Sequence, residues 1–212
     1  MDIENFRREY LQGGLRREDL FEDPVAQFRH WLEQVVASGV IDPSAMVVST
    51  VSKQGQPSQR IVLLKQAEDD GFVFYTNYGS RKAKEIAENN QVSLLFPWNA
   101  LERQVKVCGK AEKIPLTESV KYFMSRPRDS QLAAWASEQS SSISSRDFLM
   151  TQLARMKEKF GEGEVPLPDF WGGIKIIPEQ VEFWQGGANR LHDRFEYNLQ
   201  SDGRWTVERL AP

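Results

Sequence analysis

The sequence contains few of the residues that bind metal ions or form disulfides. Its 212 residues include one cysteine, Cys108, and two histidines, His30 and His192, which lie far apart in the chain. A single cysteine excludes an internal disulfide framework and a cysteine-rich metal site, and it is typical of a reducing compartment. Two isolated histidines leave too few ligands for a zinc centre. We therefore expect no metal site.

Long apolar runs and an excess of basic charge are also missing. The chain has 27 Lys and Arg against 30 Asp and Glu, and this net charge of −3 argues against a general nucleic-acid binder. No apolar run approaches the roughly 18 residues of a membrane span. The first residues, MDIENFRREY, lack the apolar core of a secretory signal. We therefore expect a soluble, cytoplasmic protein that binds neither nucleic acid nor membrane.

The motifs of several common catalytic sites are absent as well. The sequence has no G-x-G-x-x-G after a strand, no G-x-x-x-x-G-K-[ST], no H-E-x-x-H and no G-x-S-x-G. It also has no C-x-x-C and no clear Cys/His pair, so the side chains alone offer little redox or nucleophilic chemistry. If the protein is an enzyme, a cofactor is expected to carry the difficult step.

Hydrophobic periodicity predicts one domain of strands with helices between them. Residues 1–22 are polar and are expected to form an N-terminal arm, and residues 23–212 a single domain. Helices are predicted over 24–38, 81–89, 116–125, 131–137 and 145–160. Strands are predicted over 45–51, 58–65, 72–76, 91–96, 104–114, 172–177, 180–185, 194–199 and 204–210. The Ser-rich stretch 137–145 is expected to be an ordered loop or a mobile lid.

The early strands are joined mostly by tight turns, which favours antiparallel pairing. The fold expected from this pattern is a β-barrel with peripheral helices, an α+β arrangement, rather than a doubly wound sheet.

Four clusters combine cationic side chains with hydroxyl or other polar groups, a mixture that suits phosphate monoesters. They are Arg60 with Lys65; Thr76 with Ser80, Arg81 and Lys82; Tyr122 with Arg126, Arg128 and Ser130; and Arg190 with His192 and Arg194. Each cluster has a simpler interpretation, because basic pairs usually form solvated surface. The SRPRDS stretch (125–130) is explained equally well as an interhelix loop, His192 as a surface histidine, and Trp184 as a core residue.

Several stretches resemble the pyridoxamine/pyridoxine 5′-phosphate oxidase family, and together they cover nearly the whole chain. The most specific are RPRDSQ (126–131) and WQGGANRLHDR (184–194). Further matching stretches span 7–20, 45–65, 72–86, 92–112, 121–141 and 165–195. The resemblance implies an FMN-binding split barrel, mostly antiparallel, that works as a homodimer with the flavin in a cleft between subunits. It also implies oxidation of pyridoxamine 5′-phosphate or pyridoxine 5′-phosphate to pyridoxal 5′-phosphate. A hydride would pass from substrate C4′ to flavin N5, and O₂ would be reduced to H₂O₂.

The resemblance also implies which residues form the site. One subunit is expected to hold FMN through Arg60, Ile61, Val62, Leu63, Leu64, Lys65, Tyr75, Thr76, Arg81, Lys82 and Gln104, and the other to close over it with Gln139, Ser140, Trp184 and Arg194. The substrate is expected to contact Arg7, Arg8, Glu9, Tyr10, Lys65, Tyr122, Arg126, Ser130, Arg190, Leu191 and His192. Arg190 and His192 are the expected catalytic residues, with His192 either donating a hydrogen bond or assisting proton removal.

All of these cations are expected to converge on two phosphate esters. Two other functions fit a flavin or phosphate site: a different split-barrel flavin oxidoreductase, and a non-catalytic carrier of flavin or pyridoxal phosphate. A nucleic-acid module that uses the arginine pairs is a third alternative, which the net charge disfavours.

Overall fold

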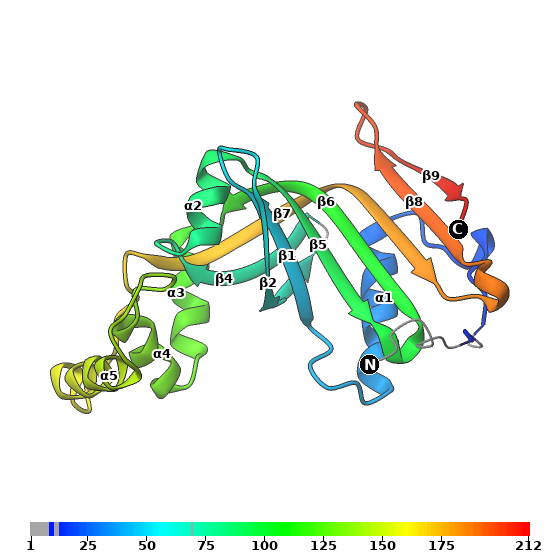
Figure 1. Ribbon diagram of the computed structural model, residues 1–212. Coiled ribbons are helices and arrows are strands. Elements are labelled where there is room, and N and C mark those ends of the chain that lie inside the picture. The colour runs from blue at the N-terminus through cyan, green and yellow to red at the C-terminus, as the bar shows by residue number, and fades with distance from the viewer. Residues whose placement is uncertain (1–8, 11–12, 69) are drawn as a thin grey trace.

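The computed structural model describes residues 9–10, 13–68 and 70–212. Within them, a nine-stranded antiparallel sheet forms the body of the molecule, and helices lie around it (Figure 1). The strands are β1 (Ala45–Val51), β2 (Pro57–Leu63), β3 (Gln66–Glu68), β4 (Gly71–Asn77), β5 (Gln91–Trp98), β6 (Arg103–Lys113), β7 (Trp171–Gln185), β8 (Asp193–Leu199) and β9 (Trp205–Leu210). The helices are α1 (Pro24–Ala37), α2 (Arg81–Glu88), α3 (Leu116–Ser125), α4 (Arg128–Ala136) and α5 (Arg146–Phe160), with 3-10 turns η1 (Arg17–Asp19), η2 (Asn99–Leu101) and η3 (Ala188–Arg190).

The long strand β7 organises the sheet, whose order is β2-β1-β5-β6-β7-β4-β3, with β8 and β9 continuing from β7. On one side β7 pairs with β6. On the other it pairs with β4 over Trp171–Ile176 and with β8 over Gln180–Gln185. The sheet therefore divides along β7 into a β3–β4 ribbon and a β8–β9 ribbon. This confirms the expected antiparallel sheet with peripheral helices.

Two prolines lie inside strands, where the sequence predicts strand ends. The prediction of separate strands over 172–177 and 180–185 is wrong, because β7 runs through Pro178. Pro178 lies between the segment of β7 that pairs with β4 and the segment that pairs with β8. On that side it is paired with neither strand, so the N–H that proline lacks is not needed for a hydrogen bond in the sheet. Pro97 likewise lies within β5, beyond Leu95, where the pairing of β5 with β1 stops.

A bulge beside Pro178 bends the central pair of strands. The register of β6 against β7 shifts between Cys108 and Gly109. A Cβ atom on Gly109 would lie 2.1 Å from the carbonyl oxygen of Ile177, so only glycine fits there without a shift of the backbone. The bulge therefore depends on a close backbone approach that hydrophobic periodicity does not indicate.

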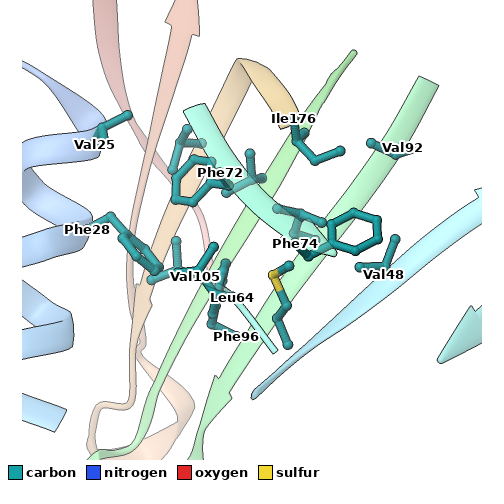
Figure 2. Close-up of a cluster of buried hydrophobic side chains, with 14 of the residues drawn as sticks. Val25, Phe28, Val48, Leu64, Phe72, Phe74, Val92, Phe96, Val105 and Ile176 are labelled. Atoms are coloured by element: carbon teal, nitrogen blue, oxygen red, sulfur yellow. The ribbon is translucent and has the colours of Figure 1, made fainter. Parts of the chain in front are cut away.

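The main core lies between the sheet and α1. Phe28 of α1 packs against Phe72 of β4 and Phe96 of β5, with ring centroids 4.9 and 4.6 Å apart (Figure 2). Asp23 caps α1 by accepting hydrogen bonds from the backbone N–H of Val25 and Ala26, as the Asp-Pro sequence predicts. Full burial of each such aromatic side chain contributes roughly 1.5–3 kcal/mol.

A second, smaller core gathers α3, α4 and α5 at one end of the molecule, whereas β8 and β9 lie toward the other end (Figure 1). Its buried residues are Phe123, Leu132, Val165 and Trp171. Residues 137–144, which include the Ser-rich stretch, join α4 to α5 without regular secondary structure.

The later part of the predicted arm packs on β8. The backbone N–H of Leu15 donates to Asp193 Oδ2 at 3.0 Å, and Tyr197 Oη donates to the carbonyl of Phe21 at 2.8 Å. Arg7 and Arg8 lie outside the described residues. No described helix is both long enough and apolar enough to cross a membrane.

Candidate functional site

A cavity of about 410 Å³ opens beside the small helical core. Many of the predicted site residues line it, and we call them the cavity group: Ile61, Val62, Leu63, Lys65, Tyr75, Thr76, Lys82, Tyr122, Arg126, Ser130 and Gln139. They come from β2, β4, α2, α3 and α4 and the segments that follow β2 and α4. Asn77, Ala133, Ala134, Ser137 and Trp171 also line the cavity and were not predicted.

A buried ammonium group lies at the start of α2. Lys82 is 7% exposed, and its Nζ donates to Thr76 Oγ1 at 3.1 Å and to Gln139 Oε1 at 3.2 Å. Thr76 also donates to Gln139 Oε1, at 3.1 Å. Burial, together with the nearby charge of Arg60, lowers the pKa of Lys82 to about 8. No ion pair to Lys82 is present in the described part of the chain, so the Gln139 oxygen occupies a position suited to an anionic oxygen.

Near Lys82, the buried carboxylate of Glu85 binds the guanidinium groups of Arg60 and Arg81. Glu85 Oε1 accepts from Arg81 Nε at 2.8 Å. Glu85 Oε2 accepts from Thr50 and Ser58 at 2.5 Å each and from Arg60 at 3.5 Å. Burial would raise the pKa of Glu85, but the hydrogen bonds from Ser58, Thr50 and Arg81 outweigh it and lower the pKa to about 2.

Several predicted cofactor residues lie outside the cavity group. Arg60 is directed to Thr50, Ser58 and Glu85 rather than into the cavity. Arg81 lines an adjoining cavity of about 700 Å³ together with Ser140. Leu64 is buried in the main core. Sequence reasoning missed Glu85, although its position four residues after Arg81 on a predicted helix was a usable signal.

Part of the cavity lining is aromatic, and next to it lies the guanidinium of Arg126, which has no hydrogen-bonding partner in the described part of the chain. Tyr75 stacks on Tyr122 with ring centroids 3.8 Å apart, and Arg126 Cζ lies 4.7 Å from the ring centroid of Trp171. Tyr75 Oη and Arg126 Nη1 are buried and have no hydrogen-bond partner among the described residues. Burial raises the pKa of Tyr75 to about 12 and lowers the pKa of Arg126. A half-buried cation with an unmatched N–H is suited to an anionic ligand.

Arg128 belongs to the same sequence cluster as Arg126, but it stabilises the end of a helix. Its guanidinium donates to the carbonyls of Gly161 and Gly163, at 2.5 and 2.7 Å, at the C-terminal end of α5. The cluster predicted from SRPRDS therefore divides into a cavity residue, Arg126, and a helix-capping residue, Arg128.

The other predicted residues form a second set, the β8 group, near the C-terminal end of β7: Gln104, Trp184, Arg190, Leu191, His192 and Arg194. Gln104 and Arg194 flank Trp184 in the strand register. Tyr10 of the arm lies edge-on to the rings of Trp184 and His192, with centroids 5.6 and 5.4 Å away. Arg190 and Leu191 are exposed.

The turn that carries Arg190 and His192 has an unusual backbone. Asn189 and Arg190 have φ angles of 52° and 62°, in the left-handed region that is rare outside glycine. A Cβ atom on Gly187 would lie 2.3 Å from the carbonyl oxygen of Leu191. The N–H of Gly187 donates to His192 Nδ1 at 3.1 Å, so a neutral His192 ring carries its proton on Nε2.

Arg194 is held by a buried carboxylate. Glu182 Oε1 accepts from Arg194 Nε at 2.8 Å, and Glu182 Oε2 accepts from Lys106 at 2.6 Å. The hydrogen bond that Arg194 donates to Glu182 raises the pKa of Arg194. The residue is therefore a fixed cation with a defined orientation.

Within one chain the two groups are far apart. Tyr75 pairs with Gly173, and Trp184 lies eleven residues further along β7. At about 3.3 Å per residue, this places Trp184 on the order of 30 Å from Tyr75 along the strand. Trp184 and Tyr75 therefore do not meet within one chain, and the expected site lies in a cleft between two subunits. Gln139 and Ser140, expected from the opposite subunit, lie with the cavity residues of their own chain, whereas Gln104 lies with Trp184.

Comparison with known proteins shows the family. A model described as "Pyridoxamine 5'-phosphate oxidase" matches residues 32–160, and one described as "Pyridoxine 5'-phosphate oxidase C-terminal dimerisation region" matches residues 171–212. Proteins named pyridoxine/pyridoxamine 5′-phosphate oxidase from Teredinibacter turnerae and Pseudoalteromonas translucida are 62% and 58% identical to the chain over all 212 residues, with full coverage of both proteins.

Solved structures agree. PhzG from Burkholderia lata, in complex with tetrahydrophenazine-1-carboxylic acid, has a TM-score of 0.88 and 26% identity, covering 93% of this chain and 98% of its own. A pyridoxamine 5′-phosphate oxidase-related, FMN-binding protein from Nostoc punctiforme has a TM-score of 0.72 at 14% identity, with coverage of 87% and 97%, which supports the fold alone. By sequence over its full length and by fold, the chain belongs to the pyridoxamine 5′-phosphate oxidase family.

Proposed function

We propose that the protein is a pyridoxine/pyridoxamine 5′-phosphate oxidase that depends on FMN. It oxidises pyridoxine 5′-phosphate or pyridoxamine 5′-phosphate to pyridoxal 5′-phosphate, and O₂ is reduced to H₂O₂. The observation that carries the proposal is one cavity lined both by the buried Lys82 ammonium and by the Arg126 guanidinium, each suited to an anion. Relatives with this name are 56–62% identical over their full length.

The residues of the cavity fit FMN, which has one phosphate ester and a flat ring system with polar edges. Lys82, Thr76 and Gln139 offer a buried site for the phosphate at the start of α2, where free backbone N–H groups also favour an anion. β2 is an edge strand, so the outer backbone groups of Ile61–Leu63 are free to bind the ring edge. When bound, FMN supplies the acceptor for the hydride that leaves substrate C4′.

The second anion place fits the phosphate of the substrate. Lys65, Tyr122, Arg126 and Ser130 provide the cations and hydroxyls, and they lie in the same cavity as the proposed flavin residues. Binding energy from a phosphate remote from C4′ can orient the reacting carbon. Each charge-assisted hydrogen bond of this kind contributes roughly 1.5–3 kcal/mol.

A second copy of the chain completes the site in this proposal. None of the β8 group lines the cavity of its own chain, Trp184 lies eleven residues along β7 from the partner of Tyr75, and residues 171–212 match a dimerisation region. Ile61 and Leu63, at the mouth of the cavity, are 72% and 41% exposed in one chain. Large apolar side chains at that exposure are suited to cover by another subunit.

The β8 group then has defined tasks. Arg190 covers the substrate ring, and Arg194 places positive charge at the flavin, where electrons arrive. His192 donates a hydrogen bond to the substrate through Nε2–H, because its Nδ1 lone pair is already occupied by the Gly187 N–H. Donation therefore replaces proton removal as the proposed role of His192. Tyr10 packs on Trp184 and His192 and limits the access of water. Arg7 and Arg8 remain expected substrate contacts.

A different flavin oxidoreductase is the main alternative. The neighbour from Burkholderia lata binds a tricyclic acid without a phosphate. The unpartnered Arg126, with Ser130 beside it in the cavity, favours a phosphorylated substrate instead.

The test is direct. The purified protein is expected to be yellow, or to take up FMN when offered it, and to produce peroxide with pyridoxine 5′-phosphate. A chain that refuses FMN contradicts the flavin assignment. A chain that holds FMN but produces no peroxide with either phosphorylated substrate is a carrier or a different oxidoreductase.

A further inference from the structure

Arg126 is held differently from the other arginines of the site. Arg81 and Arg194 each donate to a buried carboxylate at 2.8 Å, Glu85 and Glu182 respectively. No hydrogen bond or ion pair to the Arg126 guanidinium is present among residues 9–10, 13–68 and 70–212, and its Nη1 is buried. Its closest aromatic contact is the face of Trp171, with Cζ 4.7 Å from the ring centroid, and Phe123 lies at 5.7 Å.

Contact with a ring face stabilises a guanidinium without occupying its donors. The N–H groups of arginine lie in the guanidinium plane, so stacking leaves them free for oxygen ligands, whereas a carboxylate partner uses one or more of them. A free arginine side chain also loses rotamer entropy when it is fixed. When the arginine side chain is already held in place before the ligand binds, ligand binding costs less of this rotamer entropy.

The backbone of Arg126 is fixed as well. Pro127 restricts the preceding residue to extended conformations, and Arg126 has φ −75° and ψ 149°. The buried Gln131 donates from Nε2 to the carbonyls of Phe123 and Arg126, at 3.0 and 3.1 Å. Only the long side chain remains to be oriented.

Trp171 is itself rigidly placed. It is 8% exposed, begins β7 and lines the cavity. Its ring is nearly parallel to those of Tyr75 and Tyr122, at interplanar angles of 13° and 3°.

We propose that Trp171 is a positioning residue that holds the Arg126 guanidinium ready for the substrate phosphate and so sets the preference for phosphorylated substrates. This inference rests on the proposed function and adds to it a residue that the sequence analysis did not select.

The test separates binding of the phosphate from binding of the ring. The flavin-loaded wild type, Trp171→Phe and Trp171→Leu are compared by the KM for pyridoxine 5′-phosphate and by the inhibition constant of pyridoxine, which has the same ring without the phosphate. Because a cation–π contact contributes about 0.5–2 kcal/mol, Trp171→Leu is expected to raise the KM between about 2-fold and 30-fold. The inhibition constant of pyridoxine, the kcat and the FMN content are expected to stay unchanged. Trp171→Phe keeps a weaker ring face and is expected to show a smaller rise.

Val165→Ala is the matched control, because Val165 belongs to the same small core but does not line the cavity. It is expected to leave the KM unchanged. If the KM of the Trp171 variants is unchanged, as is expected for Val165→Ala, or if the KM and the inhibition constant of pyridoxine rise together, the proposal is overturned. If Trp171→Leu does not fold, the proposal is tested by the same two constants of Trp171→Phe, the KM for pyridoxine 5′-phosphate and the inhibition constant of pyridoxine. A wild-type chain that fails to turn over pyridoxine 5′-phosphate contradicts the proposed function rather than this inference.

Discussion

At the scale of single residues, Arg126 and Arg128 show how neighbours in one motif separate by their contacts. Arg126 has a buried N–H that no described residue pairs with, whereas Arg128 donates two hydrogen bonds to the end of α5. Residue type and spacing indicate that SRPRDS is cationic. They do not indicate which of its cations is left free, because that depends on the loop at 161–163, which folds back from elsewhere in the chain.

The two arginines make a matched pair for mutation. Arg126→Ala is expected to raise the KM for pyridoxine 5′-phosphate by about 10-fold to 100-fold, since one charge-assisted contact of about 1.5–3 kcal/mol is lost. Arg128→Ala is expected to lower the melting temperature and to leave the KM near the wild-type value. Steady-state kinetics and thermal unfolding measure both. A larger KM effect for Arg128→Ala would contradict the assignment.

The buried carboxylate Glu85 predicts a pH dependence of stability. Its pKa is about 2 in the folded chain against a usual 4.5, so the unfolded chain binds more protons between these values. Above about pH 4.5, Glu85 therefore adds on the order of 3 kcal/mol to the free energy of unfolding. This contribution is lost as the pH falls toward 2.

Denaturant unfolding of Glu85→Gln and wild type at pH 6 and pH 3 tests this dependence. The difference in unfolding free energy is expected to shrink at pH 3. Glu88→Gln, on the exposed face of the same helix, is the control, and it is expected to show little difference at either pH. A Glu85 difference that is constant with pH would contradict the account.

The hydrogen bond at His192 Nδ1 predicts which substitutes retain function. A glutamine can place an amide N–H near the position of Nε2, whereas an asparagine cannot reach it. Loss of one donated hydrogen bond is expected to lower kcat by about 2-fold to 13-fold, whereas loss of a general base lowers it by about 10²–10⁴-fold. His192→Gln is therefore expected to lose less than about tenfold in kcat, and His192→Asn more than His192→Gln. Equal losses beyond 10²-fold in both would restore the role of a base.

At the scale of elements, the turn between β7 and β8 sets the position of two proposed catalytic side chains. Gly187 has no room for a Cβ, and Asn189 and Arg190 are left-handed. Strained residues of this kind persist only where the surrounding structure requires them. The sequence analysis gave Asn189 no role, although asparagine is among the residues that tolerate this conformation.

Gly187→Ala tests this element. The added methyl would lie 2.3 Å from the Leu191 carbonyl oxygen, so the turn must shift and carry Arg190 and His192 with it. Because a displacement near 1 Å can cost about 10²-fold in rate, kcat is expected to fall by about that factor. FMN content and melting temperature serve as internal controls and are expected to stay close to wild type. Wild-type turnover would show that the turn does not position the site.

The elements also show what the sequence can predict. The periodicity of Val25, Phe28, Trp31 and Val35 predicts α1 correctly, because its apolar stripe is buried against the sheet. The prolines at 97 and 178 are wrongly predicted to end strands, because their tolerance depends on where neighbouring strands stop. The three-residue strand β3 was missed, since it is too short to show a pattern.

At the scale of the whole molecule, the site residues divide between two ends of β7. The resemblance to the family located both groups, because each lies in a distinctive local motif. It did not show that Gln104 lies beside Trp184, or that Gln139 contacts Thr76 and Lys82 of the same chain, since these positions follow from sheet register and from contacts between distant segments. The distance between the groups is also invisible in the sequence, because it is set by the unbroken length of β7. A homodimer brings such separated groups together when the cavity of each subunit faces the β8 group of the other.

Mixing two variants that are each impaired at a low substrate concentration tests this arrangement most directly. Arg126→Ala and Arg190→Met homodimers are unfolded, mixed in equal amounts, refolded with FMN and assayed at a low concentration of pyridoxine 5′-phosphate. If each site takes its cavity group from one chain and its β8 group from the other, half of the dimers are mixed and each has one intact site. The account predicts recovery of about one quarter of the activity of wild type treated in the same way. Activity that stays at the mean of the two separate variants would show that each chain builds its site alone, and would contradict the account.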